Sequence, residues 1–74
     1  MSLDDTIRQR IDRKLVPSRA FGKIVARRGP FLCVGCGAND DSKHMAGELQ
    51  EGGIFPFHAS CFDAWQRITG HNSN

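Results

Sequence analysis

The residues with the clearest chemistry are three cysteines and a histidine, arranged in two pairs of equal spacing. Two residues separate Cys33 from Cys36, and two residues separate His58 from Cys61. Tetrahedral zinc accepts thiolate sulfur and imidazole nitrogen, and structural zinc sites hold four such ligands. The two pairs therefore predict one structural zinc ion (Zn2+) bound by these four residues.

Each pair lies in a local sequence that suits a metal ligand. The cysteine pair is interleaved with Gly35 and followed by Gly37, which permit the backbone angles of a tight knuckle. His58 and Cys61 would lie one turn apart on one side of a helix. Twenty-one residues separate the pairs, enough for a hairpin that returns the chain to the knuckle.

Three thiolates and one imidazole fill all four positions of a tetrahedral ion, whereas a catalytic zinc keeps one position open for water. The donor set thus favours a structural ion. Zinc(II) with three thiolates carries a net charge of −1, so we expect backbone amides and a nearby base to compensate it. The candidate bases are Arg27, Arg28 and Lys43.

Other assignments of these residues are weaker. His44 is the rival fourth ligand, but it follows a polar stretch and is expected to face solvent, and His71 lies beyond the last predicted helix. A redox role for Cys33 and Cys36 lacks a βαβ context. An iron–sulfur centre would normally use four cysteines.

The length of the chain explains why a metal is needed. A domain of 74 residues has room for one small core, and such scaffolds usually need a metal, disulfides or oligomerisation. Three cysteines cannot all pair, and the N-terminus has no apolar signal segment. No stretch is apolar for the roughly 20 residues that a membrane helix needs. We therefore expect a cytoplasmic protein with reduced thiols and no membrane association.

The elements after the knuckle are predicted from turn and strand signals. Residues 43–50 and 54–57 form a β-hairpin around a turn at 51–53, which contains two glycines. Pro56 cannot donate a ladder hydrogen bond, so the second strand should lie at an edge. A helix follows from Ser60, which with Asp63 has the spacing of a capping box.

Apolar positions indicate the core. The helix places large side chains on one face before Gly70 ends it, and residues 71–74 are expected to be a disordered tail. Phe55 is a candidate for an exposed contact patch. The predicted core comprises Phe31, Leu32, Leu49, Ile54, Phe55, Phe57, Phe62 and Trp65.

An N-terminal arm, residues 1–30, precedes this zinc-binding unit of residues 31–70. A helix is predicted from an apolar residue at every fourth position, and it must end before Pro17. It should rest on the zinc unit. Residues 17–30 read as a linker with one short strand at 24–26. The apolar stripe of the helix consists of Leu3, Ile7, Ile11 and Leu15. The fold class is a small α+β, zinc-stabilised domain.

The arm is also strongly basic, because residues 8–28 hold eight bases and only one acid. Such a segment could contact phosphates, so nucleic-acid binding is an alternative function. The bases concerned are Arg8, Arg10, Arg13, Lys14, Arg19, Lys23, Arg27 and Arg28.

The ligand pattern resembles that of known zinc fingers. A Cys-x2-Cys knuckle, a hairpin, and a His-x2-Cys pair that opens a helix resemble the treble-clef fingers. The order and gap are similar to those of the first finger of a LIM domain, without its second finger in these 74 residues. The run from His58 to Trp65 also resembles a family of small bacterial proteins with His-x2-Cys-[Phe/Tyr]-x2-Trp. The resemblance covers residues 31–70 and implies a fold and a zinc site, but no particular function.

Three functions are compatible with the sequence. The leading hypothesis is a non-enzymatic module whose zinc ion organises a platform for a protein partner, and which could be regulatory. Nucleic-acid binding is the second. The third is a small nuclease, in which His44 would be the general base and Asp40, Asp41 or Glu48 would bind a second metal.

Overall fold

The computed structural model describes residues 2–70 and shows two helices and two antiparallel sheets. Helix α1 spans Leu3–Asp12 and α2 spans Ala59–Thr69. The strands are β1 (Lys23–Arg27), β2 (Pro30–Leu32), β3 (Asn39–Asp41), β4 (His44–Glu48) and β5 (Ile54–Phe57). The chain is thus a small α+β domain, as predicted. His71 and the predicted tail lie outside the described residues.

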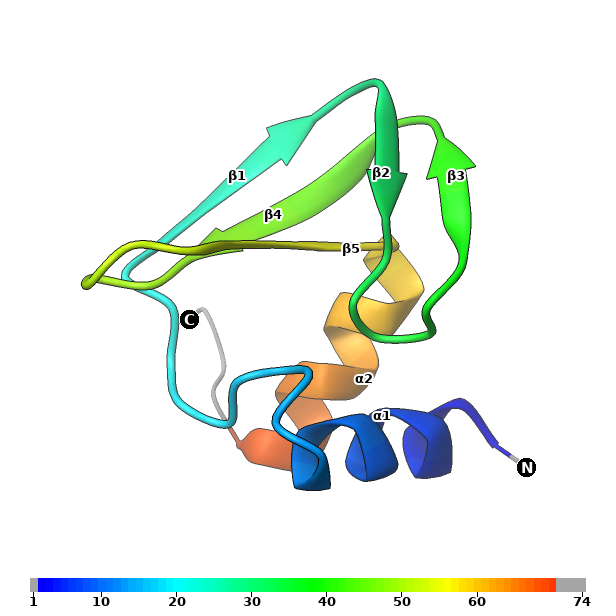
Figure 1. The fold of residues 1–74 in the computed structure, drawn as a ribbon, viewed down its shortest axis with the longest axis vertical. Helices are drawn as coiled ribbons and strands as arrows, with labels where there is room; N and C mark the ends of the chain where they lie inside the picture. Colours follow the sequence, from blue (N-terminus) through cyan, green and yellow to red (C-terminus); the bar gives the residue numbers. More distant parts are fainter. Residues whose placement is uncertain (1, 71–74) are drawn as a thin grey trace.

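The larger sheet has the strand order β1-β4-β5, and α2 covers one of its faces (Figure 1). The predicted hairpin is confirmed, with Glu48 opposite Ile54 at its closed end. Strand β5 lies at an edge, as Pro56 requires. The short strand predicted at 24–26 is β1, where Val25 pairs with Ala46. The smaller sheet is the β2–β3 hairpin.

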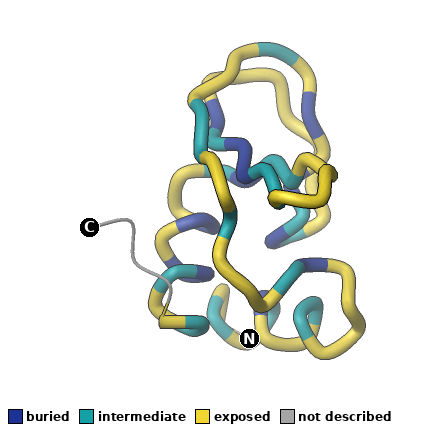
Figure 2. The backbone as a smooth tube through the Cα atoms, turned by 90° about the vertical axis from the view of Figure 1, so that its left-hand side faces the viewer, coloured by how far each residue is buried: buried dark blue, intermediate teal, exposed yellow. Residues whose placement is uncertain are grey.

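The core is an aromatic cluster between the larger sheet and α2. Figure 2 shows most exposed positions at the periphery of the molecule. Trp65 and Phe57 are almost fully buried, as predicted. Phe21 is not among the predicted core residues, yet its ring centroid lies 4.8 Å from that of Trp65 and 6.0 Å from that of Phe57. The Phe21 ring also covers Gly47, where an added Cβ would lie 2.5 Å from a ring atom. Gly47 is therefore needed for this packing.

Two predicted core residues are not in the core. Leu32 and Ile54 are each 50% exposed. Successive side chains of a strand point to opposite faces, so a buried Phe31 places Leu32 outside. Leu49 and Phe55 are only partly buried.

The N-terminal arm is docked rather than detached. Helix α1 packs against α2 and buries Ile7 completely, and Val16 is also in the core. The Trp65 indole Nε1 donates a hydrogen bond of 2.7 Å to the Pro17 carbonyl oxygen. The predicted boundary at residue 30 stays a prediction. These contacts and the β1–β4 pairing connect the N-terminal arm to the predicted zinc-binding unit.

Helix α1 ends earlier than its apolar stripe suggested. The amide of Lys14 donates to the Ile11 carbonyl and that of Leu15 to the Arg10 carbonyl, which is the Schellman pattern. Leu15 consequently lies outside the helix and is 47% exposed. Lys14 takes the left-handed conformation, with φ of 62°, at the position that glycine usually occupies.

We expect Lys14→Gly to raise the free energy of unfolding by about 0.5–1 kcal/mol. Glycine adopts positive φ without the Cβ clash, although its greater freedom in the unfolded chain offsets part of the gain. Denaturant unfolding of the metal-loaded protein would measure the change. Lys14→Ala, which keeps a Cβ, is the control and should show no gain; equal effects of the two substitutions would contradict the explanation.

Candidate metal centre

The cysteine pair lies in the turn that joins β2 to β3. The Cys33 amide donates to the Ala38 carbonyl, and the Gly37 amide donates to the Cys33 carbonyl at 2.7 Å. Gly37 has φ of 80°, a conformation that favours glycine. The Val34 amide donates to the Pro56 carbonyl and thus holds the turn against β5. The knuckle is therefore fixed by backbone hydrogen bonds.

The second pair lies where β5 passes into α2. His58 is the N-cap residue of α2, and Cys61 lies in the first turn. The predicted capping box is wrong: the helix begins at Ala59, so Ser60 is already inside it and cannot be the N-cap. The amide of Phe62 donates to the His58 carbonyl and closes the first turn. One helical turn thus brings the imidazole and the thiol to the same side.

The four predicted ligands come together. The sulfur atoms of Cys33, Cys36 and Cys61 and a ring nitrogen of His58 all lie within 4.8 Å of one another. The His58 Nδ1 atom is 3.5 Å from Cys36 Sγ and 3.9 Å from Cys61 Sγ. A tetrahedron with bonds of about 2.3 Å to sulfur and about 2.0–2.1 Å to nitrogen has a sulfur–nitrogen edge of roughly 3.6 Å. This cluster could therefore hold one metal ion.

The outward ring nitrogen of His58 has a partner of its own. Its Nε2 lies 3.0 Å from Asp40 Oδ2. When Nδ1 binds a metal ion, Nε2 carries the ring proton and can donate it to this carboxylate. A carboxylate in this position fixes the ring orientation and increases the basicity of the ligating nitrogen. Strand β3 brings Asp40 to the site, a position that no sequence pattern indicates.

We expect Asp40→Ala to weaken metal binding about 10–100-fold, because His58 loses the contact that orients its ring. Competition with a chromophoric chelator would measure the affinity. Asp41→Ala is a matched control, since its carboxylate has no contact with His58 while its backbone amide still donates to Asp40. Equal affinities of the two variants would contradict the role given to Asp40.

Without a metal ion, burial and neighbouring groups shift the pKa values of three of the four candidate ligands. Burial, together with the neighbouring thiols of Cys33 and Cys36, raises the pKa of Cys61 to about 12. Burial opposes ionisation of Cys33 too, but backbone hydrogen bonds, the largest from His58, outweigh it and lower its pKa. Burial also opposes protonation of His58, whereas Asp40 and Cys36 raise its pKa overall. A metal ion must therefore displace protons from the cluster, so its binding depends on pH.

Groups around the cluster suit a negatively charged metal complex. The His58 backbone amide donates to Cys33 Sγ at 3.3 Å, and the N-terminus of α2 carries partial positive charge. Arg10 Nε donates to the Val34 carbonyl in the knuckle at 2.6 Å. The described contacts thus bring Arg10 to the knuckle because α1 docks beside the turn, while charge compensation by Arg27, Arg28 or Lys43 stays a prediction.

His44 does not face solvent as predicted, and it is not part of the cluster. Its side chain is 5% exposed, and its ring stacks on Phe31 with centroids 3.9 Å apart. Its Nδ1 atom is 3.0 Å from the Ser42 carbonyl oxygen. The side chain is buried against the Phe31 ring of β2, a contact that the polar sequence before His44 does not reveal. The alternative role of His44 as a general base stays a prediction.

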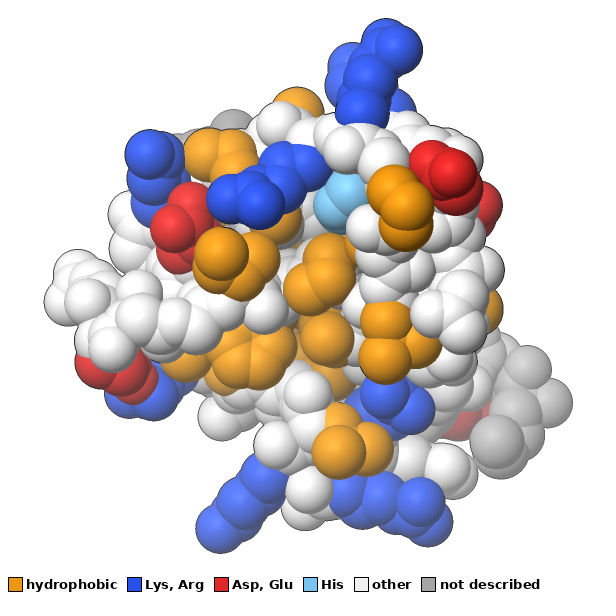
Figure 3. Space-filling view, turned by 45° about the horizontal axis from the view of Figure 1, so that its top comes forward, with side chains coloured by type: hydrophobic (Ala, Val, Ile, Leu, Met, Phe, Trp, Pro, Cys, Tyr) orange, Lys and Arg blue, Asp and Glu red, His pale blue; other side chains and the backbone are white. Residues whose placement is uncertain are grey.

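The predicted basic residues are spread over several elements. Arg8 and Arg10 belong to α1, whereas Lys23 and Arg27 belong to β1, on the other side of the core. Arg19 forms an ion pair with Glu51. Figure 3 accordingly shows Lys and Arg side chains in separate groups with hydrophobic side chains between them. Nucleic-acid binding by these residues stays a prediction.

Comparison of the chain with protein-family models, with curated proteins and with solved structures found no match. The assignment of the four residues as a possible metal centre therefore depends on the positions of their donor atoms. Within residues 2–70, neither helix is long and apolar enough to cross a membrane. The cytoplasmic location stays a prediction.

Proposed function

We propose that the chain is a non-enzymatic module in which one structural zinc ion, bound by Cys33, Cys36, His58 and Cys61, organises a surface for a protein partner. The observation that carries the proposal is the convergence of four donor atoms within 4.8 Å. Three sulfurs and one nitrogen are the donors that zinc prefers, and they complete its coordination.

The order of elements around the cluster supports a treble-clef finger. The knuckle lies in the β2–β3 turn, the β4–β5 hairpin follows, and α2 supplies the second pair of ligands. In such a fold the metal joins a turn to a helix and replaces part of a core that a chain of 74 residues cannot supply. The ion thus acts through the shape of the domain.

A protein partner is supported by apolar side chains that remain in contact with solvent. Leu32 on β2 and Ile54 on β5 are each 50% exposed, and Leu15 in the segment after α1 is 47% exposed. Exposed apolar side chains become favourable contacts when a partner covers them.

Metal analysis tests the first part of the proposal. The folded, purified protein should contain one zinc ion per chain, and cobalt substitution should give the absorption of a tetrahedral thiolate site. A folded protein without stoichiometric metal, or a cobalt site with an exchangeable water ligand, would overturn the structural role.

Affinity capture tests the second part. The metal-loaded chain should retain a protein from nuclease-treated extract of its host, and the purified partner should bind it again in a defined mixture. If nuclease treatment removes all captured material and the chain binds DNA or RNA at low salt, the nucleic-acid alternative is correct instead.

A further inference from the structure

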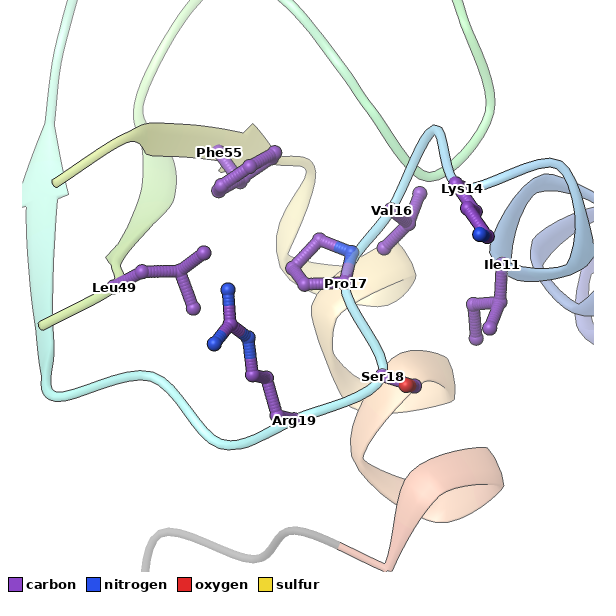
Figure 4. A pocket seen from close by; sticks show the side chains of 8 residues that line it. All are labelled: Ile11, Lys14, Val16, Pro17, Ser18, Arg19, Leu49 and Phe55. Atoms are coloured by element: carbon purple, nitrogen blue, oxygen red, sulfur yellow. The ribbon is translucent and has the colours of Figure 1, made fainter. Parts of the chain in front are cut away.

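A pocket separate from the metal cluster lies between the β4–β5 hairpin and the segment that follows α1 (Figure 4). Its volume is about 390 Å³, within the range of ligand sites. Leu49 and Phe55 form one wall, and Ile11, Val16 and Pro17 form the other. None of the four metal ligands lines it. The pocket can therefore receive an apolar group without disturbing the cluster.

The polar lining of this pocket is basic. Lys14 and Arg19 contribute the charged side chains, Ser18 completes the lining, and no acidic residue takes part. Arg19 pairs with Glu51 in the β4–β5 turn, and both side chains are more than half exposed. Lys14 has no ion pair within residues 2–70. The charge of Lys14 is thus uncompensated. The charge of Arg19 is paired only with an exposed carboxylate, and such a pair is weak in water.

The backbone at Lys14 is a second, independent observation. Lys14 holds a left-handed conformation with φ of 62°, at a helix end where glycine would be unstrained. A lysine here costs stability, and its side chain lines the pocket. Strain of this kind at a pocket points to a functional use of the side chain.

We infer that this pocket binds an extended acidic segment of a protein partner, which inserts an apolar side chain and places one carboxylate on Lys14 and another on Arg19, because these two side chains lie on opposite sides of Pro17 (Figure 4). The inference rests on the proposed function and names the chemistry of the partner. The second of these carboxylates replaces Glu51 on Arg19, so Glu51 acts as a competitor within the chain.

A nucleic acid fits this pocket less well. Proteins that bind single strands use several aromatic platforms and a row of cations. The pocket offers one aromatic side chain, Phe55, among aliphatic side chains and two cations. An apolar side chain flanked by negative charge matches this lining better than a base with its phosphates.

The probe for a test is N-acetyl-glutamyl-leucyl-glutamic acid amide, and the peptide with both glutamates replaced by glutamine is its uncharged match. Titration of isotope-labelled, metal-loaded protein, followed by NMR, should give saturable shifts at the amides of Lys14, Leu49 and Phe55. The glutamate probe should bind more tightly than the glutamine analogue. No shifts at these amides, or equal binding of the two probes, would overturn the inference. Stronger shifts of the same amides with an oligothymidylate would assign the pocket to nucleic acid.

Two variants give opposite expectations. Lys14→Gly should weaken binding of the glutamate probe roughly threefold to fivefold, as loss of an exposed charge pair would. It should not unfold the chain, because it relieves strain. Glu51→Gln should strengthen binding, because it frees Arg19. Lys23→Ala, an exposed lysine on β1, is the control. Unchanged binding by Lys14→Gly or weaker binding by Glu51→Gln would contradict the inference, whereas failure of the metal analysis would count against the proposed function alone.

Discussion

Cys61→Ala and Cys36→Ser are each expected to leave the chain unfolded at neutral pH. Structural zinc contributes roughly 10–16 kcal/mol in small zinc peptides, which is comparable to the whole stability of an ordinary domain, about 5–15 kcal/mol. Loss of one thiolate opens the cluster and separates the knuckle from the start of α2. Far-ultraviolet circular dichroism and metal analysis of the purified variants would show the loss of structure and of bound metal.

A matched pair of histidine variants controls this experiment. His58→Ala should behave like the cysteine variants, whereas His44→Ala should still bind one metal ion. His44→Ala should nevertheless lose stability, because the His44 ring is buried and stacks on Phe31. Loss of metal from His44→Ala, with metal retained by His58→Ala, would show that the other histidine is the ligand.

Chelation and acid should each unfold the unsubstituted protein, as the cysteine substitutions are expected to do. A strong chelator removes the ion that joins the two parts of the cluster. The raised pKa values of His58 and Cys61 in the metal-free cluster mean that protons compete with the metal. Apparent affinity should therefore fall as the pH falls, and the chain should unfold as the metal leaves. A chain that stays folded after complete metal removal would contradict the structural role.

Trp65→Ala is expected to lower the free energy of unfolding of the metal-loaded protein by about 3–5 kcal/mol. The side chain is 1% exposed, and its ring lies among Phe21, Phe57 and Phe62. The substitution removes this packing and also the hydrogen bond to Pro17 that holds the N-terminal arm. Denaturant unfolding at saturating zinc would measure the loss while the metal content stays constant.

Trp65→Phe separates the two contributions. It keeps an aromatic ring in the cluster but cannot donate to the Pro17 carbonyl, so it should cost less than alanine. Hydrogen exchange at residues 16–21 should nevertheless increase, because the Pro17 contact is lost in both variants. Equal losses of stability in Trp65→Ala and Trp65→Phe would show that the hydrogen bond, rather than the packing, dominates.

The spacing of a few residues was sufficient to predict which donor atoms come together and where the hairpin forms. Two Cys/His pairs, each separated by two residues, converge because a turn and the first turn of a helix each bring neighbours to one side. Glycines at 52 and 53 and the edge position of Pro56 likewise follow from backbone conformation and hydrogen bonding. Local chemistry of this kind is visible in a sequence because the residues involved are close along the chain.

Contacts between distant parts of the chain could not be predicted in this way. Phe21 is a single aromatic residue in a loop, and no pattern indicates that its ring covers Gly47 and packs on Trp65. Arg10 is 24 residues away from Val34 in sequence, and it reaches the knuckle only because α1 docks there. Asp40 reaches His58 only because the β2–β3 hairpin folds beside the start of α2.

The sequence alone therefore determined which atoms can bind a metal, since ligand type and spacing are local properties. The tertiary structure decided which groups surround the four donor atoms, which histidine is buried and where the pocket lies. Each of those depends on how helices and strands pack, and packing is set by the whole set of side chains that must share one small core.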